Sequence, residues 1–299
     1  MATAYTRRSN NIAKTWLLMT SFLVMIIGLG FAATWYFGSS LILYIAIAFS
    51  LLMNITSYWF SDRIVLGMSG AKPASREEYF DLWNAVENLS ITAGLPMPKV
   101  YVIEEEVPNA FATGRNKEKA TVAVTTGLLK ILDKSELEGV IAHELAHIQN
   151  NDILLQTVVV VLVGFVTLLS DFFLRFAFFG GGGDRGGQAK LIGIVIGITL
   201  AILAPLVAVV IQLAISRKRE FMADASGALL TRYPEGLAGA LEKIGGYAGE
   251  MKRANHATAH LYISNPFGSE HKGKKKKSFV NRMFSTHPPI EDRIRALLE

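Results

Sequence analysis

The chain has 299 residues, of which 51% are apolar and 18% charged, and its formal net charge at pH 7 is +5. This composition is too apolar for two ordinary soluble domains and favours a membrane protein, and the modest charge gives no reason to expect a nucleic-acid partner. Because the chain has no cysteine, disulfides and thiolate metal sites are excluded, and any zinc ion must be held by His, Asp or Glu.

Four apolar segments are long enough to cross a bilayer as helices, which takes about 20 residues. Only Gly38-Ser39-Ser40 separates the first two, which predicts a tight hairpin. The last two could instead be buried helices of a large soluble core, but both reach spanning length with almost no charge. The predicted spans are residues 16–37, 41–60, 153–173 and 191–215.

The distribution of Lys and Arg predicts the orientation of these spans. The first span is too long for the core of a signal peptide and is expected to be a retained anchor. Basic residues precede the first span and follow the second and the fourth, whereas the turn at residues 38–40 has none. Both termini and residues 61–152 are therefore expected in the cytoplasm. The basic residues concerned are Arg7, Arg8, Lys14, Arg63, Lys72, Arg76, Arg217, Lys218 and Arg219.

The polar segments, residues 61–152 and 216–299, are predicted to be the two halves of one cytoplasmic domain, and residues 1–60 and 153–215 the two membrane hairpins. In the first half, a capping box of Ser75 and Glu78 predicts a helix to about residue 92. β-Branched or alternating patterns then predict strands at residues 99–104 and 121–125, and hence a small sheet.

The second half is predicted to be helical at residues 217–231 and 234–260. A glycine-rich stretch at residues 178–188 is typical of a flexible connector outside the cytoplasm. The lysine-rich residues 272–277 indicate a solvated loop, with contact to anionic lipid as the alternative.

Residues 143–147 read His-Glu-Leu-Ala-His, an HExxH motif. Residues four apart share one face of an α-helix, so His143 and His147 can present two imidazoles to one metal ion. Glu144 lies about 100° further round the helix, where its carboxylate can accept a proton from an attacking water molecule.

The helix that carries the motif is predicted to begin at a capping box of Ser135 and Glu138. An apolar stripe beside the histidines indicates that this helix packs against a core. The stripe consists of Leu137, Ile141, Leu145 and Ile148.

A catalytic zinc ion needs a third protein ligand. Geometry favours Glu220, because antiparallel packing of the third and fourth spans would bring it level with the motif. Asp224, one turn further on, can accept a hydrogen bond from a ligating histidine. Glu220 could also be a surface carboxylate paired with an arginine. The other candidates are His256 and His260, more simply interpreted as exposed helix histidines, and His287.

The HExxH motif, together with three further stretches, resembles the HtpX family of bacterial membrane zinc metalloproteases, relatives of the CAAX prenyl proteases. The stretches are Asn-Ala-Phe-Ala-Thr-Gly at 109–114, Ser-Arg-Lys-Arg-Glu-Phe-Met-Ala-Asp at 216–224 and Thr-His-Pro-Pro at 286–289. The resemblance covers essentially the whole chain. It agrees with the predicted fold class, an α-helical integral membrane protein with four transmembrane helices and a mainly α, α+β zincin-like cytoplasmic protease domain containing a small sheet.

The resemblance implies a heat-shock-induced endopeptidase of the bacterial inner membrane whose substrates are damaged or misassembled membrane proteins. By motif match, one zinc ion per chain would be held by His143, His147 and Glu220. Glu144 would be the catalytic base, and Asp224 would orient a histidine.

Two further assignments come from the residues themselves. His287, fixed by the prolines that follow it, is predicted to stabilise the oxyanion, with a structural loop histidine as the alternative. Asn109, Ala110, Phe111 and Ala112 are predicted to form an exposed edge strand to which an extended substrate adds by main-chain pairing, with an ordinary sheet strand as the alternative.

Two other classes of function fit the sequence less well. A zinc-binding membrane scaffold without proteolysis would not need Glu144. A solute transporter would call for ionisable groups within the spans. The spans hold few polar groups, such as Asn54 and Gln212, with Asp171 near an end.

Overall fold

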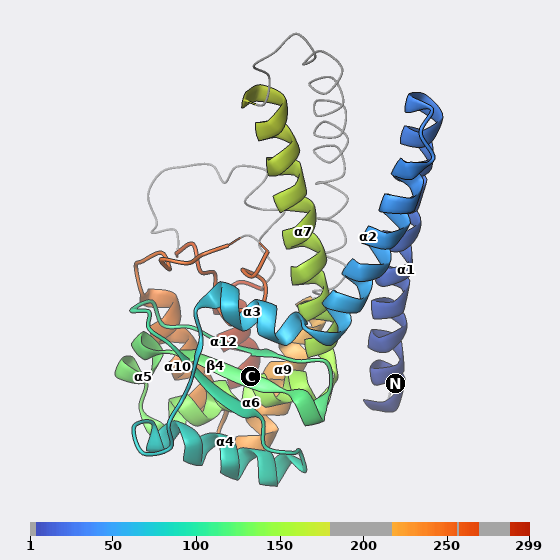
Figure 1. Ribbon diagram of the computed structural model, residues 1–299. Helices are drawn as coiled ribbons and strands as arrows, with labels where there is room; N and C mark the ends of the chain where they lie inside the picture. The colour runs from blue at the N-terminus through green and yellow to red at the C-terminus, as the bar shows by residue number, and fades with distance from the viewer. Residues whose placement is uncertain (1–3, 180–216, 256, 269–287) are drawn as a thin grey trace.

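The computed structural model describes residues 4–179, 217–255, 257–268 and 288–299. Two long helices, α1 (Ala4–Phe37) and α2 (Leu41–Trp59), form a hairpin that projects from a domain of shorter helices and a small sheet (Figure 1). Gly38, with a φ of 70°, lies in the turn between them, in a conformation that favours glycine. Both outer ends of the hairpin therefore lie beside the domain.

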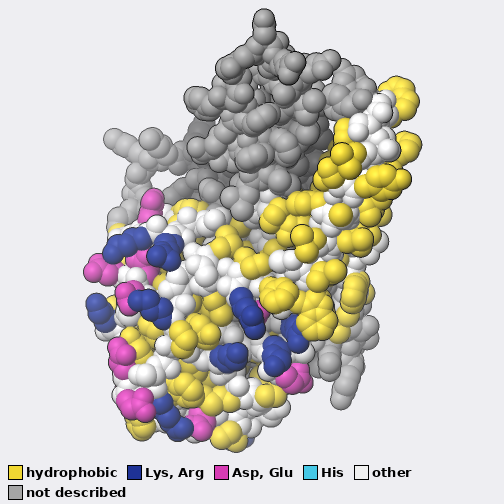
Figure 2. Space-filling model, viewed as in Figure 1, with side chains coloured by type: hydrophobic (Ala, Val, Ile, Leu, Met, Phe, Trp, Pro, Cys, Tyr) yellow, Lys and Arg dark blue, Asp and Glu magenta, His cyan; other side chains and the backbone are white. Residues whose placement is uncertain are grey.

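The hairpin has the length and composition of two membrane spans, at Asn11–Ala32 and Leu41–Trp59. On the face that Figure 2 shows, apolar side chains predominate on the coloured part of the hairpin, whereas the charged side chains lie mainly on the domain. The third predicted span lies in α7 (Asp152–Phe179). The part of α7 up to Val166 has the length and hydropathy of a membrane span only when it is counted together with the preceding helix, from which it is bent by 85°. That span stays a prediction. The fourth, at 191–215, and the connector residues 180–188 lie outside the described residues.

The sheet has four strands in the order β1-β2-β4-β3. The two central strands, β2 and β4, are parallel and pair Lys99 with Thr121, and both outer strands are antiparallel to their neighbours. The strands predicted near residues 99 and 121 are thus confirmed, and the third, β3, lies at an edge. The strands are β1 (Lys72–Pro73), β2 (Lys99–Ile103), β3 (Ala110–Thr113) and β4 (Thr121–Thr125).

Helix α6 (Lys134–Gln149) lies at the centre of the domain and contacts α4, α9 and α10. The two polar segments of the sequence therefore pack together around one helix. The remaining described helices are α3 (Ser61–Ser69), α4 (Phe80–Ala93), η1 (Lys117–Lys119), α5 (Thr126–Ile131), α9 (Arg217–Thr231), α10 (Pro234–Gly246) and α12 (Ile290–Leu298).

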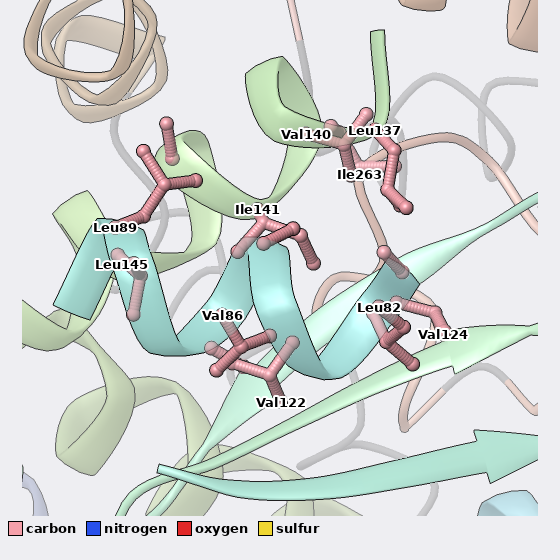
Figure 3. Packing of buried hydrophobic residues seen from close by; sticks show 14 of the residues in the cluster. Leu82, Val86, Leu89, Val122, Val124, Leu137, Val140, Ile141, Leu145 and Ile263 are labelled. Atoms are coloured by element: carbon pink, nitrogen blue, oxygen red, sulfur yellow. The ribbon is translucent and has the colours of Figure 1, made fainter. Parts of the chain in front are cut away.

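The core of the domain lies between the sheet, α4 and α6. Figure 3 shows side chains of all three elements meeting in this core. The predicted apolar stripe of α6 is fully buried there, which fixes the rotation of the helix about its axis. The labelled residues are Leu82, Val86, Leu89, Val122, Val124, Leu137, Val140, Ile141, Leu145 and Ile263.

Two predicted helix starts are wrong. Helix α6 is capped by Asp133 and Glu136, whose side chains and backbone N–H groups bond reciprocally, while Ser135 donates its hydroxyl hydrogen to Asp133. Helix α4 begins at Phe80. The hydroxyl of Ser75 does accept the backbone N–H of Glu78, but it caps a turn that comes directly before the helix.

The predicted helix from 234 to 260 ends early, at Gly246. Adjacent glycines at 245 and 246 disfavour its continuation. The following residues form irregular turns, and Tyr262 packs its ring edge-on against Phe111 of β3, with ring centroids 5.2 Å apart. This segment lies over the outer edge of the sheet.

Candidate metal centre

The HExxH residues lie in the interior of the domain. His143, Glu144 and His147 are 1%, 2% and 5% exposed. Helix α9 crosses α6 at very short range, because a Cβ atom added to Gly227 would lie 3.0 Å from the backbone nitrogen of His143. The glycine allows this close approach. As a result, Glu220, in the first turn of α9, lies next to the two histidines.

Three side chains converge on one point. The Nε2 atoms of His143 and His147 are 3.2 Å apart. The carboxylate of Glu220 lies 3.8 Å from the first and 3.7 Å from the second, through different oxygens. One ligand atom of each residue lies within 4.8 Å of the others. The surface-carboxylate interpretation of Glu220 is wrong, since it is 1% exposed.

These distances fit a zinc ion. Two nitrogens that each lie about 2.0–2.1 Å from one tetrahedral zinc are about 3.3–3.4 Å apart, close to the observed separation. Two imidazoles and one carboxylate are also a ligand set of catalytic zinc sites, and leave a position for water or substrate. The donor set and its spacing therefore suit this metal.

Each histidine is held from behind by a carboxylate. Nδ1 of His143 lies 2.9 Å from Asp224, and Nδ1 of His147 lies 3.2 Å from Asp152, the first residue of α7. A hydrogen on each Nδ1 leaves the Nε2 lone pair directed at the metal position. Asp224 was predicted from helical spacing. Asp152 was missed, although a carboxylate five residues after the motif was a usable signal.

Arg293 of α12 is a second residue that sequence reasoning missed. Its guanidinium is completely buried and donates to both oxygens of Asp224, at 2.9 and 2.7 Å, and to the carbonyl of Ile263 at 3.1 Å. The signal was present in the sequence, because Arg293 shares the apolar face of α12 with Ile290, Ile294 and Leu297. A charged residue on such a face indicates a buried partner.

The pKa values of the two histidines differ. Burial lowers the pKa of His143 to about 4, despite the hydrogen bond with Asp224, so the ring is neutral at pH 7. Burial also acts to lower the pKa of His147, but Asp152, Glu220 and Glu144 together raise it to about 9. These carboxylates stabilise positive charge between them. A divalent cation would benefit from the same field and would displace the proton.

Glu144 is placed to exchange protons. Burial raises its pKa to about 7, against the opposing effects of His147 and of the backbone N–H of Ala112, which donates to the carboxylate. A carboxyl whose pKa lies near neutrality can both accept and return a proton. Ala112 belongs to the edge strand β3, so the strand and the predicted base are in direct contact.

The predicted substrate strand is at the sheet edge but is not exposed along its length. Asn109, Ala110, Phe111 and Ala112 are all buried. Ile263 donates its backbone N–H to the carbonyl of Ala110, and the Asn109 side chain bonds both backbone groups of Ser264. The outer edge is therefore already covered at its start.

Of the other candidate histidines, only His260 lies among the described residues. His260 is 1% exposed, and its Nε2 lies 3.3 Å from the carbonyl oxygen of Gln156 in α7, so the prediction of an exposed helix histidine is wrong. The predicted helix ends before it, and the irregular segment folds back against α7. His256, His287 and the lysine-rich residues 272–277 lie outside the described residues.

Comparison with known proteins identifies the family. Residues 78–299 match peptidase family M48. The chain is 46% identical to the "Protease HtpX homolog" of Caldanaerobacter subterraneus subsp. tengcongensis, over 99% of this chain and 97% of the relative. It is also 46% identical to the proteins of the same description from Tropheryma whipplei and Dictyoglomus turgidum, over 99% of this chain and 98% and 94% of theirs.

Among solved structures, a crystal structure of Ste24p from S. mikatae matches with a TM-score of 0.49 and 19% identity, covering 98% of this chain and 67% of that one. The predicted resemblance is confirmed by the sequence comparisons. On the family match and the near full-length identity, this chain belongs to peptidase family M48, a family of metal-dependent peptidases, and is similar throughout to HtpX-type membrane proteases.

Proposed function

We propose that this chain is a zinc-dependent endopeptidase of the bacterial inner membrane that hydrolyses damaged or misfolded membrane proteins at the cytoplasmic face, as part of a stress response. The observation that carries the proposal is the buried carboxylate of Glu144 beside the cluster of His143, His147 and Glu220. A site that only bound zinc would need the cluster but not a neighbouring group poised to exchange protons.

His143, His147 and Glu220 would hold the zinc ion. When bound, the ion would polarise the scissile carbonyl and increase the acidity of water. Glu144 would accept the proton of the attacking water and deliver it to the leaving amine. Asp224 and Asp152 would keep both rings in the tautomer that directs Nε2 inward, so that the ligands are pre-oriented.

The contacts of β3 support a substrate site that is shorter than the four predicted residues. Ile263 already occupies the carbonyl of Ala110, whereas the backbone N–H of Ala112 faces Glu144. An extended substrate would therefore approach the end of the strand at Ala112, beside the base that this N–H contacts, rather than pair along all four predicted residues. His287 remains our proposed donor for the oxyanion.

The membrane hairpin supports the proposed location. Both of its outer ends lie beside the catalytic domain (Figure 1). Arg63, Lys72 and Arg76 follow the second span closely, and by the positive-inside rule such a cluster favours a cytoplasmic location for this side. The site would then act close to the inner surface of the bilayer, where misassembled membrane proteins expose loops and unfolded segments.

A single substitution tests the proposal. We expect both the wild type and purified Glu144→Gln to bind about one zinc ion per chain. We expect Glu144→Gln to lose cleavage of an unfolded substrate such as casein by at least the 10²-fold typical of a general base. Zinc content would be measured by elemental analysis and cleavage by gel assay.

Glu138→Gln is the matched control, because it makes the same chemical change on the same helix at a partly exposed position. It should keep both zinc and activity. Cleavage by Glu144→Gln at the wild-type rate would refute the mechanism. Zinc binding without any cleavage by the wild type would favour the scaffold alternative.

A further inference from the structure

Asn11, near the start of the first membrane helix, is buried although it is polar, and is only 7% exposed. Its side-chain amide donates to an oxygen of Asp152 at 2.6 Å and to the carbonyl of Asn150 at 3.2 Å. Its carbonyl oxygen accepts a hydrogen bond from Arg219 at 3.3 Å. Both functional groups of the amide are thus engaged by residues far away in the sequence.

The hydrogen-bond partners of Asn11 lie beside the proposed metal ligands. The second oxygen of Asp152 lies against Nδ1 of His147, and Arg219 immediately precedes Glu220. Arg219 also lies 3.8 Å from the Asp152 oxygen that Asn11 contacts. One amide of α1 therefore contacts both the carboxylate behind His147 and the residue that precedes Glu220 in the sequence.

An amide suits this position better than any charged side chain. It offers a donor to the carboxylate and an acceptor to the guanidinium at the same time. An aspartate would repel Asp152, and a lysine would repel Arg219. An apolar residue would leave an oxygen of Asp152 with Arg219 as a more distant partner, so that the carboxylate could rotate away from the histidine ring.

We infer that Asn11 is a positioning residue for the zinc site, through which the docked first hairpin holds Asp152 against His147. This inference rests on the proposed function of the cluster as a zinc site. Its consequence is that the site is fully ordered only when α1 is seated against the start of α7, beside which it runs (Figure 1).

The experiment measures zinc affinity of the full-length protein in detergent by competition with a chromogenic chelator. Asp152→Asn should weaken zinc binding by about 10–100-fold, as loss of a direct outer partner does, and Asn11→Leu, one step further out, by about 3–10-fold. Leucine is similar in size and more compatible with a membrane helix. If Asn11 only stabilised the packing of α1, Asn11→Leu would leave the zinc affinity unchanged.

Asn54→Leu is the matched control. Asn54 lies in the same hairpin, and among the described residues its side chain bonds only within α2, to the carbonyl of Ser50. It should retain wild-type affinity. In the Asp152→Asn background, Asn11→Leu should add no further loss, because its route to the ligand is already removed. The absorption spectrum of the cobalt-substituted protein should shift in Asn11→Leu and not in Asn54→Leu.

Wild-type affinity and an unchanged cobalt spectrum in Asn11→Leu would overturn the inference, and so would fully additive losses in the double variant. Both outcomes differ from failure of the proposed function, in which the wild type itself would bind no zinc.

Discussion

Replacing Arg293 by leucine should destabilise the protein strongly although the residue is neither a proposed metal ligand nor the proposed base. The guanidinium is fully buried and makes two charge-assisted bonds to Asp224 and one to the carbonyl of Ile263. Removing one partner of a buried ion pair costs about 3–5 kcal/mol, because the other charge stays buried without compensation. For a domain of this size, that loss lowers the melting temperature by about 6–20 °C.

The assay is thermal unfolding of the purified protein in detergent, followed by circular dichroism, with Arg295→Leu as the control. Arg295 lies on the same helix, but its side chain is 68% exposed and its contact with Asp292 is 4.0 Å long, so its loss should cost less than about 0.5 kcal/mol. Adding Asp224→Asn to Arg293→Leu should recover part of the stability by removing the uncompensated charge. If Arg293→Leu unfolds at the same temperature as Arg295→Leu, the buried ion pair does not stabilise the domain.

Two further predictions concern the metal and the packing of α6. A chelator should abolish cleavage and added zinc should restore it, so chelator-resistant cleavage would contradict a metal mechanism. Zinc at about 100-fold above its Kd should also raise the free energy of unfolding by about 2.7 kcal/mol. Gly139→Ala should cost about 1–3 kcal/mol in thermal unfolding, because the added Cβ would lie 2.6 Å from the backbone nitrogen of Leu237. Gly67→Ala, where no atom lies within 4 Å of the added Cβ, should be neutral or stabilising, and equal melting of the two variants would argue against close packing of α6 and α10.

Much of the metal centre could be predicted because its residues follow helical spacing. His143 and His147 are one turn apart, and Glu220 and Asp224 are likewise, so each pair occupies one face by geometry alone. The predicted apolar stripe also fixed which side of α6 meets the core. These inferences need only the local period of a helix.

The residues that were missed depend on long-range packing. Arg293 and Asp224 are 69 positions apart, and Asn11 and Asp152 are 141 apart, so no local pattern brings either pair together. The burial of His260 has the same origin, since it follows from where the chain goes after α10 ends. Helix starts were misplaced by a few residues because nearby polar side chains compete for the same cap.

The bend between α6 and α7 fixes the number of residues between His147 and Asp152 as closely as the helix fixes the number between His143 and His147. Asn151 adopts a positive φ of 57°, and the chain turns by 85° there, so that Asp152 points back at His147. One inserted or deleted residue in this junction would rotate that carboxylate by about 100° around the helix axis and detach it from the ring. The two histidines and the carboxylate behind His147 therefore lie in one continuous ten-residue segment, from His143 to Asp152, whose last residue already belongs to the next helix.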